Sequence, residues 1–283
     1  MSDLAVITIV HGRFEHLRNQ QLGLSRSTDT DVDWVVVAID DPSLSDWRPT
    51  GAVQPRLVSH PSQSRDLPLA AARNAGARAA LAAGATTLVF LDVDCVPDPG
   101  LVEAYRHVAQ QRDTARTLMC GPVSYLPPAP STGYDLTSLE GLAAPHPARP
   151  APERGVVLSG GDHDLFWSLS FAVRAETWRV IGGFCDRYVG YGGEDTDFGR
   201  KARTLGVEVS WIGSARAFHQ HHATEDPPAG HLEDIVRNSN LFHRRWQVWP
   251  MQGWLDAFVS RGLIHRTPDG YALTCEYLPV CER

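Results

Sequence analysis

Short apolar runs alternate with helix-forming segments along the first 115 residues of the chain. Aliphatic and β-branched side chains fill residues 4–10, 33–39 and 87–91, with a weaker run at 56–59. Such runs, bounded by polar residues, predict buried β-strands. Helices are expected between them, over 15–24, 69–83 and 101–111. This alternation predicts an α/β fold with a mostly parallel sheet flanked by helices on both faces.

The second half of the chain has a less regular pattern. Strands are expected over 117–123, 168–174 and 207–212, and helices over 175–181, 194–205 and 231–261. Residues 127–152 are rich in Pro, Ala and Gly, and they predict a long loop that is either a substrate-binding flap or a mobile insertion. The last twenty residues predict no element.

Polar residues follow three of the predicted strands. They are His11, Gly12 and Arg13 after the first strand, Asp40 and Asp41 after the second, and Asp92, Val93 and Asp94 after the fourth. Ligands of parallel α/β sheets bind at the carboxyl ends of the strands. We therefore expect these three strand ends to line one crevice.

Asp92 and Asp94 could hold a divalent cation in that crevice. Mg²⁺ and Mn²⁺ favour carboxylate oxygens and complete their shell with substrate phosphates. The alternative is an Asp-rich turn that caps the next helix, because Asp, Pro and Gly crowd residues 92–100. The triplet alone does not separate these two interpretations.

A second acidic cluster, Glu194, Asp195 and Asp197, opens a predicted helix. Acidic residues stabilise the positive end of a helix, which explains one or two of them. The preceding Gly192 and Gly193 are not explained in this way, and they would let the backbone approach a ligand closely. A partly desolvated carboxylate at this place could accept a proton from an attacking hydroxyl group.

Three histidines follow the last predicted strand, at positions 219, 221 and 222. A lone histidine is usually structural, but three within four residues favour a metal site. His219 and His221 would share a face if the segment is extended. One imidazole and two carboxylates would leave positions open for phosphate oxygens.

Four further residues are candidates for donor binding. Arg73 and Asn74 lie in the Ala-rich helix, and Arg65 precedes them in a polar loop. An arginine suits a phosphate group, although a solvated helix face is the alternative. Trp167 is placed either beside the donor or acceptor or as an anchor of the core or flap.

Composition limits the protein class. Hydrophobic residues make up 43% and charged residues 21% of the 283 residues, as in ordinary soluble globular proteins. The formal net charge of −7 and the lack of a long basic run argue against nucleic-acid binding. The five cysteines form no CxxC pair, and we find neither a signal peptide nor an integral membrane segment. We expect a cytoplasmic protein, at most peripheral to a membrane.

Taken in order, these residues resemble the GT-A glycosyltransferases, and more closely their family 2-like members. The matching pieces are the strand ends at 11–13 and 40–41, Ala72 to Gly76, Phe90 to Asp94, and Gly182 to Phe198. The second half is also similar to the catalytic regions of β-galactosyltransferases and polypeptide N-acetylgalactosaminyltransferases. The resemblance spans residues 4–222, and the ordered set is more specific than the D-x-D triplet.

The resemblance implies a nucleotide-sugar donor, by preference a UDP-sugar, whose diphosphate is bridged by Mn²⁺ or Mg²⁺. Asp94 would be the principal metal carboxylate, with Asp92 on the ribose or the metal and a histidine of 219–222 completing the shell. Asp40 or Asp41 would contact the nucleoside. Asp195 would be the base that activates a saccharide or other hydroxyl acceptor, and Glu194 would bind hydroxyl groups. Inversion by single displacement is expected, with retention as the alternative.

The resemblance also implies a domain division. Residues 1–225 would form the catalytic domain, with a nucleotide-binding half at 1–115 and an acceptor and catalytic half at 116–225. Residues 226–283 would be a helical extension packed on the same domain. A nucleotidyltransferase is the alternative enzyme, although it would normally carry a Gly-rich basic loop after the first strand. A catalytically silent sugar-nucleotide-binding module is the non-enzymatic alternative.

Overall fold

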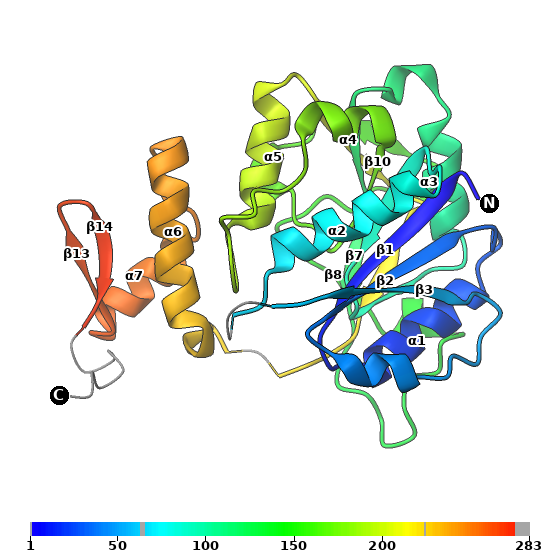
Figure 1. The fold of residues 1–283 in the computed structure, drawn as a ribbon, viewed down its shortest axis with the longest axis horizontal. Helices are drawn as coiled ribbons and strands as arrows, with labels where there is room; N and C mark the ends of the chain where they lie inside the picture. Colours follow the sequence, from blue (N-terminus) through cyan, green and yellow to red (C-terminus); the bar gives the residue numbers. More distant parts are fainter. Residues whose placement is uncertain (1, 63–65, 224, 275–283) are drawn as a thin grey trace.

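A computed structural model describes residues 2–62, 66–223 and 225–274 of the chain (Figure 1). Arg65, one of the predicted donor-binding residues, lies outside the described residues, as do Cys275 and Cys281.

Eight strands form the central sheet. They are β1 (Leu4–Val10), β2 (Asp33–Ile39), β3 (Pro55–His60), β4 (Thr87–Leu91), β6 (Thr117–Cys120), β9 (Val157–Ser159), β10 (Ser170–Arg174) and β11 (Glu208–Ile212). Their order is β3-β2-β1-β4-β10-β6-β11-β9, and β10 and β9 run opposite to the other six. The predicted mostly parallel α/β sheet is confirmed.

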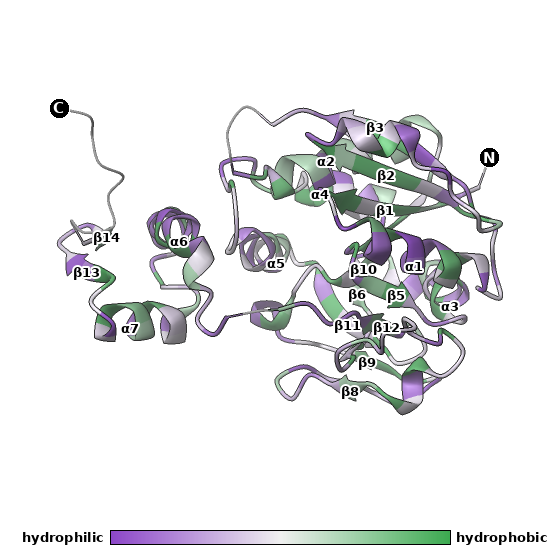
Figure 2. Cartoon of the chain, turned by 90° about the horizontal axis from the view of Figure 1, so that it is seen from below, coloured by the Kyte–Doolittle hydropathy of each residue, from purple (hydrophilic) through white to green (hydrophobic). Residues whose placement is uncertain are grey.

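Helices cover both faces of this sheet. Their bounds are α1 (Phe14–Ser25), α2 (Leu69–Ala82), α3 (Leu101–Ala109), α4 (Ala175–Ile181) and α5 (Glu194–Thr204). Helices α2, α4 and α5 contribute to one apolar core, and α1 and α3 contribute to the core on the other face. Strand β1 serves both cores, because its side chains alternate between the two faces. Figure 2 shows β1 and β2 largely in the green of apolar residues.

Gly76 lets α2 lie unusually close to the sheet. A Cβ atom at this position would come within 2.5 Å of Ile7 Cγ2 and 3.0 Å of Val37 Cγ2. Both contacts are shorter than packed carbon atoms tolerate, so the helix depends on the missing side chain. The close packing fixes the distance between the sheet and the preceding turn of α2, which carries Arg73.

A second, four-stranded sheet lies beside the first. Its order is β5 (Cys95–Pro97), β12 (Ala217–His219), β7 (Val123–Tyr125) and β8 (Ala144–Pro145). The strand predicted over 117–123 is therefore divided between two sheets. The loop predicted over 127–152 contains β8 and one short 3₁₀ turn. The 3₁₀ segments of the chain are Pro42–Asp46, Arg112–Thr114, Leu139–Gly141, His163–Leu165 and Ala229–His231.

The C-terminal part consists of α6 (Leu232–Trp246), α7 (Gln252–Ser260) and a hairpin of β13 (Ile264–Thr267) and β14 (Gly270–Leu273). The helical region predicted over 231–261 is broken because Gln247 and Met251 adopt left-handed backbone conformations around Pro250. The hairpin was not predicted. This part has a small core of its own, while α6 also supplies Leu241 and Phe242 to the core beneath α5. Within the described residues, no helix combines the length and apolar character needed to cross a bilayer.

Candidate active site

The carboxyl ends of β1 and β2 are tied together by hydrogen bonds. His11 Nδ1 lies 2.8 Å from the Ile39 carbonyl oxygen, and the Gly12 N–H donates to the Asp41 carboxylate at 2.8 Å. Burial raises the pKa of Asp41, but hydrogen bonds from Ser43 and Gly12 together outweigh it and lower the pKa below its ordinary value. Asp40 is exposed at the same edge. The predicted convergence of polar residues at these strand ends is therefore present.

Asp94, His219 and His222 form a candidate metal site. Their ligand atoms all lie within 4.8 Å of one another. His219 Nε2 is 3.6 Å and His222 Nε2 is 3.5 Å from the Asp94 carboxylate. Arg13 Nη1 also contacts that carboxylate, at 2.9 Å. One carboxylate oxygen and two imidazole nitrogens suit a transition-metal ion such as Mn²⁺ and leave coordination positions for phosphate oxygens.

The electrostatics of this group suit metal binding. Burial would raise the pKa of Asp94, but the hydrogen bond from His222 and the charges of His219 and Arg13 lower it below its ordinary value. Burial lowers the pKa of His219, against the opposing charge of Asp94. An ionised carboxylate and a neutral imidazole are the forms that bind metal ions. The ring of Tyr125 stacks on the His219 imidazole, with the ring centroids 4.7 Å apart, and this contact orients the imidazole.

Two predicted metal ligands lie outside this group. His219 and His221 were expected to share a face if the segment is extended, but β12 ends at His219, and His221 lies outside the group of three. His221 is exposed, and its backbone N–H donates to the Tyr134 hydroxyl at 3.1 Å. His222 takes the expected place instead. Asp92 is directed to another partner, Arg73, and does not belong to the group of three.

Arg73 joins the two acidic clusters. Its Nη2 donates to Asp92 Oδ1 at 3.0 Å, and its Nη1 donates to Glu194 Oε1 at 3.1 Å. Only 6% of its side chain is exposed, so the solvated helix face is excluded. Its charge is already shared between two carboxylates, which corrects the expectation of a guanidinium free to hold a phosphate. Members of both acidic clusters therefore lie against the same guanidinium.

The side chain of Asn74 is buried and hydrogen-bonded within the protein. Its amide donates to the Phe184 carbonyl at 2.9 Å and to Asp186, and its Oδ1 accepts from the Phe184 N–H at 2.9 Å. These bonds hold the Gly182-Gly183-Phe184 turn against α2. The buried amide contradicts the prediction that Asn74 contacts the donor.

Glu194 and Asp195 begin α5, and they differ in exposure. Glu194 is buried, and its Oε2 has no donor among the described residues. Asp195 is partly exposed and accepts from the Thr196 and Ser168 N–H groups. Burial raises the pKa of both carboxyls, and the positive charge of Arg73 opposes this in each case. Raised pKa values are typical of carboxyls that exchange protons.

The Gly192-Gly193 pair precedes α5 in left-handed conformations, with φ of 95° and 91°. A Cβ atom on Gly192 would lie 3.0 Å from the Met251 sulfur, so this turn packs against the start of α7. Asp197 has a structural role in the same cluster. It is fully buried and accepts from Arg245 Nε at 2.6 Å and Trp246 Nε1 at 2.7 Å. The third acid of the cluster therefore fastens α5 to the end of α6.

Trp167 lies at the base of the loop over 127–152. The ring of His146, from that loop, meets it edge-on at 4.8 Å. This contact fits the flap-anchor interpretation of Trp167. Val93, between the two acids of the D-x-D triplet, is buried in the core that contains α1 and α3.

Sequence reasoning missed two residues of the site. His222 was named among the histidines but was not chosen, because strand alternation does not extend beyond the end of β12 at His219. Tyr125 lies on a strand of the second sheet that was not predicted, and no local signal could have placed it under His219.

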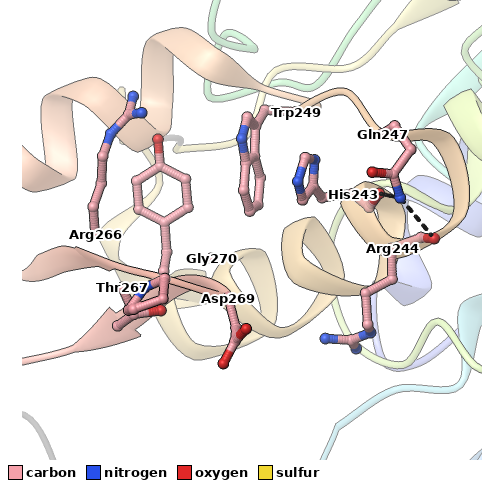
Figure 3. Close-up of a pocket in the computed structure, with 10 residues that line it drawn as sticks. His243, Arg244, Gln247, Trp249, Arg266, Thr267, Asp269 and Gly270 are labelled. Atoms are coloured by element: carbon pink, nitrogen blue, oxygen red, sulfur yellow. Dashed lines mark hydrogen bonds between the residues drawn. The ribbon is translucent and has the colours of Figure 1, made fainter.

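A separate hollow of about 410 Å³ lies in the C-terminal part (Figure 3). Its rings contact one another: His243 stacks on Trp249 at 3.9 Å, and Tyr271 meets Trp249 edge-on at 4.8 Å. It contains neither paired carboxylates nor a histidine cluster. The histidine cluster and the Arg73-bound carboxylates lie instead near the ends of the strands of the two sheets.

The fold is similar to that of GT-A glycosyltransferases, and comparisons with known proteins confirm the predicted resemblance. Residues 163–223 match the protein-family model described as the N-terminal domain of galactosyltransferase. This stretch contains Glu194, Asp195 and two of the three candidate metal ligands.

Particular relatives are found at low identity. The chain is 28% identical over 290 residues to validoxylamine A glucosyltransferase of Streptomyces hygroscopicus subsp. limoneus, a match that covers 92% of the chain. GalNAc-T7, solved with UDP, GalNAc and Mn²⁺, superposes with a TM-score of 0.58 and 14% identity over 92% of the chain. Residues 1–349 of S. aureus TarS, solved with UDP-GlcNAc, superpose with a TM-score of 0.57 and 11% identity. The match covers 93% of the chain and 73% of TarS 1–349. The chain spans only 60% of the glucosyltransferase and half of GalNAc-T7.

Proposed function

We propose that the protein transfers a sugar from a nucleotide-sugar donor, by preference a UDP-sugar, to a hydroxyl group of a saccharide or other acceptor. The observation that carries this proposal is the position of Arg73 between Asp92 and Glu194. Asp92 lies two residues before the candidate metal ligand Asp94, and Glu194 directly precedes the candidate base Asp195. The two contacts of Arg73 therefore bring the candidate metal site and the candidate base near each other. The crystal structures of GalNAc-T7 and TarS with UDP and UDP-GlcNAc support the nucleotide.

Asp94, His219 and His222 would hold Mn²⁺ or Mg²⁺, and the Mn²⁺ in GalNAc-T7 supports this choice. When bound, the ion would neutralise negative charge that develops on the departing diphosphate. The nucleoside would lie over the carboxyl ends of β1 and β2, against His11, Gly12 and the Asp40–Asp41 pair. Arg13 is within reach of the same phosphates, because its guanidinium already contacts Asp94.

Asp195 is the candidate base. Its carboxylate is partly exposed and has no ion pair among the described residues, so it is available to accept the proton of an acceptor hydroxyl. Glu194 is held by Arg73 and could accept a hydrogen bond through Oε2. A double displacement needs a second carboxylate as nucleophile, and Glu194 is immobilised in an ion pair. The geometry therefore favours a single displacement with inversion at the anomeric carbon.

The test is a screen of nucleotide sugars for slow donor hydrolysis in Mn²⁺, followed by transfer to saccharide acceptors. We expect hydrolysis of one UDP-sugar with metal present and none after chelation. The anomeric configuration of the product, read by NMR, should be inverted relative to the donor. A retained configuration would contradict single displacement while leaving the transferase assignment intact.

Asp195→Asn separates binding from turnover. We expect transfer to fall by about 10²–10⁴-fold, the usual contribution of a general base, with UDP affinity unchanged in calorimetry. Asp164→Asn is the matched control, because Asp164 pairs with Arg200 in a neighbouring turn. Binding of UDP without hydrolysis or transfer of any donor by the wild-type protein would identify a silent binding module instead.

A further inference from the structure

Arg149 is a buried guanidinium held between two tryptophan rings. It comes from the loop over 127–152, yet only 8% of the residue is exposed. Its Cζ lies 5.0 Å from the Trp167 ring centroid and 4.8 Å from that of Trp211. Cation–π contacts of this kind are strongest when the cation is desolvated, as it is here.

No carboxylate pairs with Arg149 anywhere in the described part of the chain. Its Nε and Nη1 atoms are buried and find no acceptor among the described residues, and Nη2 makes a single long contact of 3.5 Å with the Trp167 carbonyl oxygen. A buried charge without a counter-ion is costly, and burial lowers the pKa of Arg149 accordingly. Because Nε and Nη1 are buried, they cannot contact a substrate in this structure.

Arg149 is connected to Asp195 through one short piece of chain. Its guanidinium contacts both the ring and the carbonyl oxygen of Trp167. The next residue, Ser168, donates its backbone N–H to the Asp195 carboxylate. Asp195, like Arg149, has no ion-pair partner among the described residues. The Arg149 guanidinium and the Asp195 carboxylate, neither of which has an ion-pair partner among the described residues, therefore contact the adjacent residues Trp167 and Ser168.

We propose that Arg149 is a positioning residue for Asp195, acting by clamping Trp167 so that the Ser168 N–H holds the carboxylate. The positive charge of Arg149 also lowers the pKa of Asp195, against the effect of burial. This inference rests on the proposed function, in which Asp195 is the base.

Other charged and titratable groups also face these two residues. Around Asp195 they are Arg73 of α2, Asp92 after β4, Glu194 of α5 and Tyr191; around Arg149 they are Cys95, Tyr105, Cys120, Tyr125 and His146. Among the cations, Arg73 is shared by two other carboxylates, whereas Arg149 is not. Removing Arg149 should therefore act on Asp195 without breaking an ion pair.

The experiment compares Arg149→Met with Arg149→Lys in the full chain. Met can still pack between the two rings, because thioethers contact aromatic rings favourably, but it carries no charge. We expect kcat to fall by about 10- to 100-fold in Arg149→Met with donor KM changed less than about twofold, as for a misplaced catalytic group. The acid limb of the kcat profile should move to higher pH, and Arg149→Lys should restore its position.

Arg154→Met is the matched control. Arg154 pairs with Asp98 at 2.9 Å and Glu140 at 3.0 Å, so it anchors the same loop without contacting Trp167. We expect this variant to leave the acid limb in place. If both arginine variants lower kcat equally and neither moves the acid limb, Arg149 only anchors the loop and the inference is overturned.

A double-mutant cycle tests the inference without activity. Urea unfolding is measured for wild type, Arg149→Met, Asp195→Asn and the double variant. We expect Asp195→Asn to change the unfolding equilibrium constant differently in the two backgrounds, by about threefold or more, as coupled sites do. Additive effects would overturn the inference. If the wild-type protein transfers no sugar, the proposed function fails and this cycle alone decides the role of Arg149.

Discussion

The carboxylates of the candidate active site are neutralised in two different ways. Asp94 is surrounded by groups that can move or change charge: two imidazoles at 3.5 and 3.6 Å, and Arg13, whose side chain is 40% exposed. Asp92 and Glu194 share Arg73, which is buried and engaged at both ends. One side of the crevice can therefore exchange its cation, whereas the other is fixed. This difference separates the residues expected to bind ligand from those expected to hold the site together.

Arg73→Met should break the fixed side and give the largest effect. It would leave the buried Glu194 and the partly buried Asp92 without their cation, and removal of one partner from a buried ion pair costs about 3–5 kcal/mol. Urea unfolding measures the loss. Arg266→Met is the control, since the Arg266–Asp256 pair is exposed and separated by 3.6 Å, and we expect a change below about 0.5 kcal/mol. Equal stability of the two variants would show that Arg73 does not fix the crevice.

Asp94→Asn should break the exchangeable side. We expect Mn²⁺ affinity, measured by calorimetry in the presence of UDP, to fall at least about tenfold, because even outer-shell partners contribute this much. His222→Gln should weaken Mn²⁺ binding as well. His221→Gln, one residue away, should not, because His221 lies outside the group of three. If His221→Gln weakened Mn²⁺ binding and His222→Gln did not, His221 would be the ligand, as expected from the sequence.

Gly76→Ala tests how closely α2 must approach the sheet to place Arg73. The new methyl group would meet Ile7 Cγ2 at 2.5 Å, and overpacking of this kind costs about 1–3 kcal/mol. Gly253→Ala, in a helix with open space around the glycine, should instead stabilise the protein by up to about 1 kcal/mol. Thermal or urea unfolding compares the two. A harmless Gly76→Ala would mean that the helix can withdraw while Arg73 keeps both carboxylates.

The smallest effect concerns the pH dependence of stability. Burial and the negative charge of Asp195, opposed by Arg73, raise the pKa of Glu194 to about 7. A carboxyl whose pKa is raised by folding contributes stability below its unfolded pKa, and this contribution is lost as pH rises through the folded pKa. Between pH 5 and 8, the free energy of unfolding of wild type relative to Glu194→Gln should therefore decline. A flat difference would contradict the raised pKa.

The parallel half of the fold was predictable because its signals are local. The buried runs at 4–10, 33–39 and 87–91 became β1, β2 and β4, and their polar ends met as expected. Parallel strands that are buried on both faces read as continuous apolar runs, which few other structures produce. The site residues at these ends could therefore be named from the sequence.

The rest depended on contacts between distant segments. Nothing in the sequence around 117–123 shows that Thr117–Cys120 joins the central sheet while Val123–Tyr125 joins another. Alternation failed beyond His219 because the strand ends there, so His221 was chosen over His222. The role of Arg73 was misjudged for a similar reason: its partners lie 19 and 121 residues away, and only the folded chain brings them together.

The contact of Asp197 with Arg245 and Trp246 sets a boundary for engineering. These two residues end α6, yet they hold the helix that carries Asp195. A chimera that exchanges the C-terminal segment to change acceptor preference must retain both. Otherwise the fully buried Asp197 carboxylate loses its only cation among the described residues and keeps only the hydrogen bond from the Tyr188 hydroxyl as a side-chain contact. The modular unit for such exchanges therefore begins after Trp246, not at the loop before α6.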